Sequence, residues 1–213
     1  MTSTKAQPVM DSGRYEASTE ALHWIRVSFL QIERYVESFL AHAEAHSAGN
    51  VDAADAAATS TIADAHFLLN ACAQAEKALR RTGRPLPPAR KTTIRSLRDV
   101  HEHWEQHKAS FESKKNAKTK AGRRFDDAHP GHLPWTFKYD ATGTWISVLR
   151  LEDLWDELAI VELDLCEAIR SFNAAHRLPP LPAALARGGL VRRECRVIAM
   201  SMTTQNIVID FGE

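Results

Sequence analysis

Hydrophobic residues recur every three or four positions over long stretches of the chain, a spacing that places them on one face of an α-helix. One such stretch runs from about Thr19 to Ser47, and a second runs from about Asp52 to Arg81. A third, from about Leu151 to His176, carries the regular stripe Leu151, Leu154, Trp155, Leu158, Val161, Leu165, Ile169 and Phe172. The pattern therefore predicts three long amphipathic helices.

A further helix is predicted before the last of these. It begins near Thr92, a suitable N-cap, and contains the stretch IRSLRDVHEHWEQHKASF, residues 94–111. Glycine and proline separate the helices: Gly49 allows a left-handed turn after the first helix, Asp52 can cap the second, and TGRPLPPARKT ends the second. The segment KKNAKTKAGRR, residues 114–124, has six basic and no acidic residues, and we expect a mobile loop there.

The hydrophobic period changes to two near residues 134–150. There Phe137 and Tyr139 alternate with polar residues before the turn DATG, which predicts a β-hairpin. The C-terminal stretch CRVIAMSMTTQNIVIDFGE forms either two short strands or an extended tail that pairs with another surface. The predicted fold is mainly α: an antiparallel four-helix-type bundle with a short β-hairpin insertion and an extended C-terminal tail.

Length and composition divide the chain into three regions. The 213 residues fit one domain with appendages: a flexible arm over 1–16, a helical domain over 17–176, and a linker with a possibly β tail over 177–213. The polar start and the lack of an apolar run near the ~18 residues of a membrane span predict no membrane association. Three scattered cysteines without a CxxC pair suit a reducing compartment, so we expect a cytoplasmic protein.

The net charge is zero, with 27 basic and 27 acidic residues. The charge of the whole protein therefore does not indicate a nucleic-acid partner, and any such partner would depend on local charge.

The helix over residues 94–111 is predicted to have two distinct faces. At 100° per residue its core face comprises Ile94, Leu97, Val100, His101, Trp104, Lys108 and Phe111. Arg98, Asp99, Glu102 and His103 lie on the opposite face. Arg98 can pair with Glu102, and Asp99 can orient the His103 imidazole, because each pair is four residues apart. The face thus joins a permanent cation to a group that titrates near neutrality, as phosphodiester cleavage requires.

Two other interpretations of this helix remain open. Most surface helices carry paired charges, so the face can be an ordinary solvated one. The pairs His103/His107 and His42/His46 have the four-residue spacing that lets two imidazoles bind one zinc ion. However, HWEQH differs from the zincin motif HExxH in the position of its acid, and we assign no metal or cofactor.

The stretch RDVHEH, from Arg98 to His103, resembles the signature of HEPN domains: an arginine, a polar residue, three variable residues and a histidine. HEPN domains are all-α bundles with this motif on a late core helix, and the resemblance covers about residues 19–176. Many toxin-type members have a tyrosine two residues after the histidine, where this chain has Glu105.

The resemblance implies a metal-independent endoribonuclease of toxin or defence type that acts as a homodimer, with an antitoxin or another protein as a further possible partner. By this resemblance His103 is the general acid/base, Arg98 stabilises the phosphate, and Asp99 orients or tunes the site. The RNA backbone would be bound by the basic segment, through Lys114, Lys115, Lys118, Lys120, Arg123 and Arg124. The alternative is a non-catalytic bundle that dimerises or binds a protein or nucleic acid.

Overall fold

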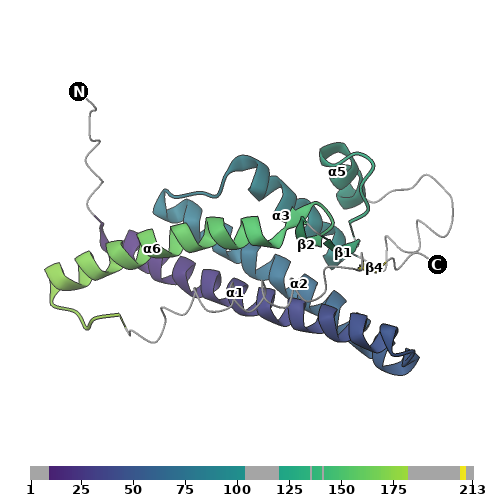
Figure 1. The fold of residues 1–213 in the computed structure, drawn as a ribbon. Coiled ribbons are helices and arrows are strands. Elements are labelled where there is room, and N and C mark those ends of the chain that lie inside the picture. The colour runs from purple at the N-terminus through teal and green to yellow at the C-terminus, as the bar shows by residue number, and fades with distance from the viewer. Residues whose placement is uncertain (1–9, 104–119, 135, 141, 182–206, 210–213) are drawn as a thin grey trace.

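The computed structural model describes residues 10–103, 120–134, 136–140, 142–181 and 207–209. Its helices are α1 (Ser12–Ser47), α2 (Val51–Thr82), α3 (Pro88–Glu102), α5 (Lys120–Ala128) and α6 (Leu151–His176). Its strands are β1 (Phe137–Asp140), β2 (Gly143–Ile146), β3 (Leu149–Arg150) and β4 (Ile207–Ile209). The chain is therefore mainly α with a small antiparallel sheet, as its hydrophobic pattern predicts (Figure 1).

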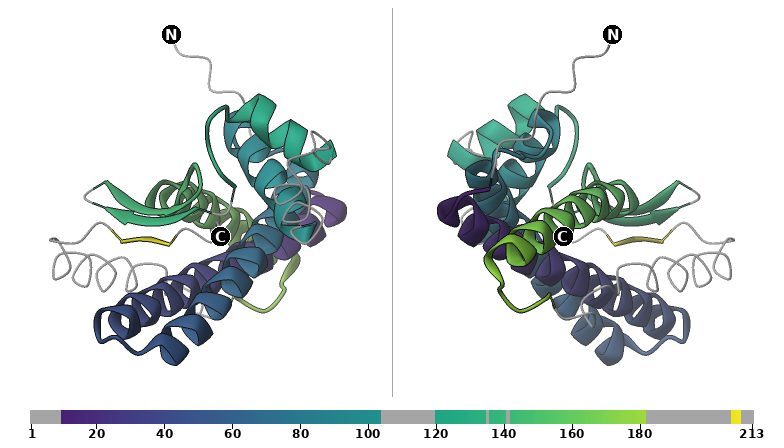
Figure 2. Two further views of the ribbon diagram at one scale, coloured as in Figure 1. Left: turned by 90° about the vertical axis from the view of Figure 1, so that its right-hand side faces the viewer. Right: turned by 90° about the vertical axis from the view of Figure 1, so that its left-hand side faces the viewer.

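Helices α1 and α2 lie side by side and antiparallel (Figure 1, Figure 2). Small side chains of α2 such as Ala65 and Ala75 are fully buried, which lets the two backbones approach closely. Between the helices Gly49 takes the predicted left-handed turn with φ 70°. The cap of α2 is Asn50 and not the predicted Asp52, because the Asn50 side chain accepts the Ala53 N–H at 3.2 Å.

The start of α1 lies earlier than the predicted Thr19. Asp11 caps it by accepting the Arg14 N–H at 2.8 Å, and the helix then includes residues 12–16, which the sequence assigns to a flexible arm. A polar first turn does not prevent this helix from forming, since Tyr15 packs on Phe172 of α6 with ring centroids 4.5 Å apart. Residues 1–9 of the predicted arm lie outside the described part of the chain.

Helix α6 has the predicted bounds and runs antiparallel to α1 (Figure 1). Its apolar stripe is buried, including Leu154, Leu158 and Ile169, each of which is fully enclosed. Burying one such side chain stabilises a fold by roughly 1.5–3 kcal/mol. No helix among the described residues has both the length and the apolar character needed to cross a membrane.

Helices α3 and α5 differ from the prediction. Helix α3 begins at Pro88 because proline is well suited to the first turn, and the Thr92 hydroxyl donates back to the Pro88 carbonyl at 3.0 Å instead of capping. Its described part ends at Glu102, and residues 104–119 lie outside the described residues. Residues 120–124, expected in a mobile loop, belong to α5, which Phe125 anchors with a fully buried ring.

The sheet has the strand order β3-β2-β1-β4, and each neighbouring pair is antiparallel. Strands β1 and β2 form the predicted hairpin, and the Tyr35 hydroxyl of α1 donates to the Trp145 carbonyl at 3.1 Å. Strand β4 comes from the C-terminal tail and pairs with β1, with Ile209 opposite Phe137. The tail thus supplies an edge strand to the hairpin.

Candidate functional site

The last turn of α3 carries the motif residues. Its core face is confirmed up to residue 100, because Ile94, Leu97 and Val100 are fully buried. This burial turns Arg98 and Asp99 toward the surface, where both are half-buried. The predicted core residues Trp104, Lys108 and Phe111 lie outside the described part of the chain, as do His107 and Glu105.

Arg98 is held by two carboxylates. Its Nη2 lies 2.5 Å from Asp99 Oδ1, and its Nε lies 3.7 Å from Glu102 Oε1, so the predicted pairing with Glu102 is present. A second guanidinium reaches the same acid, because Arg124 Nη1 of α5 lies 3.6 Å from Asp99 Oδ2. The structure therefore brings one predicted RNA-binding residue, Arg124, to the predicted catalytic pair.

His103 is exposed at the C-cap of α3. Its backbone N–H donates to the Val100 carbonyl at 3.1 Å, while the structure gives its imidazole no hydrogen bond to any described residue. The predicted contact between Asp99 and His103 is not made. The described helix stops one residue earlier, so position 103 leaves the four-residue helical spacing, and the two arginines occupy the Asp99 oxygens.

His101 has the predicted core position rather than a functional one. Its Nε2 lies 3.2 Å from the Pro134 carbonyl oxygen, and its ring lies 6.2 Å from that of Phe137. Burial lowers the pKa of His101 to about 4, against the opposing effect of the Pro134 hydrogen bond. The imidazole is therefore neutral at pH 7 and joins α3 to the segment before β1.

The remaining basic candidates separate into two groups. Lys120, Arg123 and Arg124 lie on α5, which packs against α3. Lys114, Lys115 and Lys118 lie outside the described residues.

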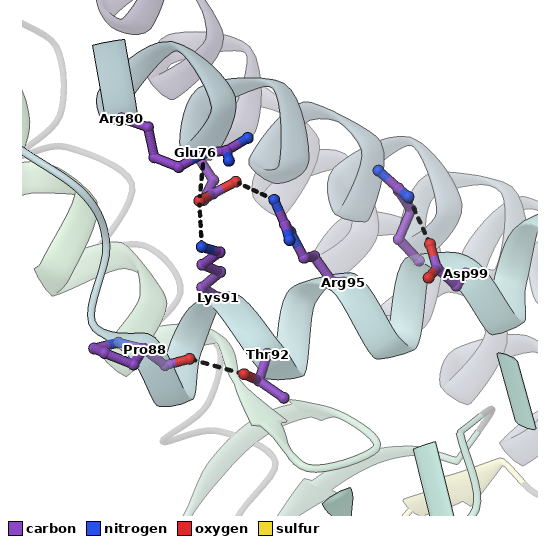
Figure 3. A network of polar contacts seen from close by, with 8 residues as sticks. Glu76, Arg80, Pro88, Lys91, Thr92, Arg95 and Asp99 are labelled. Carbon is purple, nitrogen blue, oxygen red and sulfur yellow. Dashed lines mark hydrogen bonds and ion pairs between the residues drawn. The ribbon is translucent and has the colours of Figure 1, made fainter. Parts of the chain in front are cut away.

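A buried carboxylate surrounded by three cations lies against the first half of α3, and the sequence did not predict this cluster. Glu76 of α2 is 2% exposed and is surrounded by Arg80, Lys91 and Arg95, with N···O distances of 3.1, 3.6 and 3.3 Å (Figure 3). An acid within the apolar stripe of a long helix is the sequence signal for such a cluster. Because the acid is buried and the cations are partly exposed, the surface here is basic.

Lys91, Arg95 and Arg98 follow one another at about one helical turn along α3. They form a basic strip that leads from the Glu76 cluster to His103. Among the described residues, no three His, Cys, Asp or Glu side chains lie close enough together to hold a metal ion. His42, one of the histidines considered for zinc, instead uses Nδ1 to contact the Ala54 carbonyl oxygen at 2.8 Å.

Comparison with known proteins gives no relative: no family model, no curated protein and no solved structure matches this chain.

Proposed function

We propose that the chain is a HEPN-like, metal-independent endoribonuclease of toxin or defence type, built on a four-helix-type bundle and active as a homodimer. The observation that carries the proposal is the arrangement on α3. An exposed histidine, His103, follows directly after a turn that presents Arg98, at the end of a basic strip formed by Lys91, Arg95 and Arg98.

The chemistry follows from these groups. The RNA 2′-hydroxyl loses its proton to a base and attacks the adjacent phosphorus, the bond to the 5′-oxygen breaks, and that oxygen receives a proton. The products are a 2′,3′-cyclic phosphate and a 5′-hydroxyl. One His103 can act as the base and the His103 of a second subunit as the acid, while Arg98 stabilises the charge that develops on the phosphate oxygens.

Asp99 has a different role in this proposal from the one the motif implies. Its two oxygens hold Arg98 and Arg124 rather than the imidazole, so it positions guanidinium groups. The basic strip would bind the RNA backbone through phosphate contacts, which carry no sequence information. An antitoxin or another protein partner would cover this same face.

A second function is supported by the same contacts. Arg98 is already paired with two carboxylates, and the described residues offer the His103 ring no acid to orient it. An ion-paired Arg98 beside a histidine without an orienting acid suits a non-catalytic bundle that binds a partner or a nucleic acid through α3. The two functions differ in whether RNA is cleaved.

The test is cleavage of a mixed-sequence RNA by the purified full-length protein in EDTA. Wild type is compared with His103→Ala and with His23→Ala, which removes an exposed histidine from α1. We expect EDTA-resistant cleavage that only His103→Ala abolishes. A folded wild-type protein that binds RNA without cleaving it would favour the binding function, and cleavage that EDTA abolishes would exclude the metal-independent mechanism.

A further inference from the structure

A cleft of about 720 Å³ lies where the start of α1, the end of α2 and the end of α6 meet. Its lining includes Arg14 and Ser18 of α1, Arg84 after α2, and Phe172 and His176 of α6. A volume of several hundred Å³ is typical of small-molecule sites. No residue of α3 lines the cleft, so Arg98 and His103, at the end of α3, are not part of it.

Two arginines in this cleft differ from the other half-buried arginines that the structure describes. The others each place a nitrogen 2.5–2.9 Å from a carboxylate oxygen: Arg26, Arg90, Arg98 and Arg150. Arg14 and Arg84 are also half-buried, but the structure gives neither guanidinium an ion pair or hydrogen bond to a described residue. A partly desolvated cation that is not ion-paired is unfavourable, and both examples line one cleft.

We propose that this cleft binds a small molecule with an oxyanion group, a phosphate or a carboxylate, held by Arg14 and Arg84. Arginine suits this role because its planar guanidinium pairs with oxyanions in bidentate geometry. The lining also holds Asp164 and Glu167 on the exposed side of α6. These carboxylates disfavour a polyanion such as RNA and restrict the site to small ligands with few charges.

The aromatic side chains Phe172 and His176 also line the cleft. Phe172 stacks on Tyr15 and on His176, with ring centroids at 4.5 and 3.9 Å, and His176 is exposed. A planar ring on the ligand can stack against this group. The ligand that fits best is therefore a ring compound with one phosphate or carboxylate.

The test is isothermal titration of the full-length protein with two matched pairs of probes. Adenosine monophosphate is compared with adenosine, and benzoate with benzamide, so that each pair differs chiefly in the anionic group. We expect the anionic member of at least one pair to bind and its neutral partner not to bind. Binding of the monophosphate alone identifies a phosphate site, and binding of benzoate alone identifies a carboxylate site.

Variants locate the binding. Arg84→Gln and Arg14→Gln are each expected to raise the dissociation constant of the anion about tenfold or more, since each removes a hydrogen bond to a charged group. Arg81→Gln is the matched control, because Arg81 lies three residues before Arg84 but pairs with Glu20 outside the lining. Two results would overturn the proposal: neither anion binds the wild type, or both cleft variants bind as the wild type does. Circular dichroism of each variant establishes that it is folded. The His103→Ala protein is expected to bind the anion as the wild type does, whether or not it cleaves RNA, because His103 lies outside the cleft.

Discussion

Glu76 is the residue whose surroundings differ most from those of an ordinary surface acid. Its carboxylate is buried, and the cations Arg80, Lys91 and Arg95 approach it from two helices (Figure 3). A buried acid that loses its partners is strongly unfavourable, and removing the acid leaves three positive charges close together. One carboxylate thus joins the end of α2 to the beginning of α3.

Glu76→Gln is therefore expected to lower the free energy of unfolding by about 1–3 kcal/mol, less than for a fully buried pair because the cations are partly exposed. Glu20→Gln is the control, since Glu20 forms an exposed pair with Arg81, and its expected effect is below about 1 kcal/mol. Urea unfolding at pH 7 measures both. Equal small effects would mean that the cluster contributes little to stability.

His101 makes stability depend on pH. Its pKa is lowered from 6.5 to about 4 in the folded protein, chiefly by burial, so the unfolded chain binds the proton more readily. The contribution of His101 to the free energy of unfolding is fully present above pH 6.5 and is lost as the pH falls toward 4. Between pH 7 and pH 5 this loss amounts to about 2 kcal/mol.

His101→Gln tests this dependence, because glutamine can donate to the Pro134 carbonyl but does not titrate. Urea unfolding at pH 7 and pH 5 is expected to show a smaller acid loss for the variant than for the wild type, by about 2 kcal/mol. His23→Ala, at an exposed position, serves as the comparison and should keep the wild-type loss. An unchanged acid loss in His101→Gln would show that the pKa of His101 is the same in the folded and in the unfolded protein.

At the scale of the elements, the existence of the long amphipathic helices could be predicted from the sequence. The bounds of the shorter helix α3 could not. Helix α6 has the predicted bounds because its apolar stripe is regular and, apart from the half-buried Val161, buried along the helix. The start of α3 depends on Pro88, whose favourable position at the first turn outweighs a cap at Thr92. The hydrophobic period does not report such local backbone effects.

The same limit applies to the candidate site. The sequence predicts which residues share the polar face of α3, and Arg98, Asp99 and Glu102 do lie together. It does not predict that Arg124 of α5 competes for Asp99, because that contact depends on how two elements pack. The predicted contact between Asp99 and His103 is not made, because Arg124 contacts Asp99 and because the described helix ends at Glu102.

Asp99 links α3 to α5 through Arg98 and Arg124. In the proposed nuclease its replacement should strengthen RNA binding but slow catalysis. Asp99→Asn removes a negative charge beside the phosphate site, so KM for RNA is expected to fall. It also releases Arg98 from its fixed position, so kcat is expected to fall about tenfold. Steady-state cleavage at fixed salt gives both constants. A kcat equal to that of the wild type would show that Asp99 does not position the catalytic arginine.

At the scale of the whole molecule, the fold keeps two candidate sites apart. The cleft lined by Arg14 and Arg84 lies where α1 begins and α6 ends, and the motif lies on α3, which contributes no residue to the cleft. One subunit supplies a single His103, yet the proposed reaction needs a base and an acid at the same phosphate. The nuclease proposal therefore requires two chains with their α3 ends facing one site, as in a twofold dimer.

This requirement predicts how activity depends on subunit mixing. Wild-type and His103→Ala chains are unfolded together, refolded in equal amounts, and assayed for RNA cleavage at constant total protein. If both copies of His103 are needed, only wild-type pairs are active, and random pairing leaves about a quarter of the wild-type activity. If each chain acts alone, half remains. His23→Ala chains mixed in the same way should leave activity undiminished, which separates a loss at the site from a loss in refolding. Retention of half the activity would exclude a shared site and would require one chain to supply both proton-transfer groups.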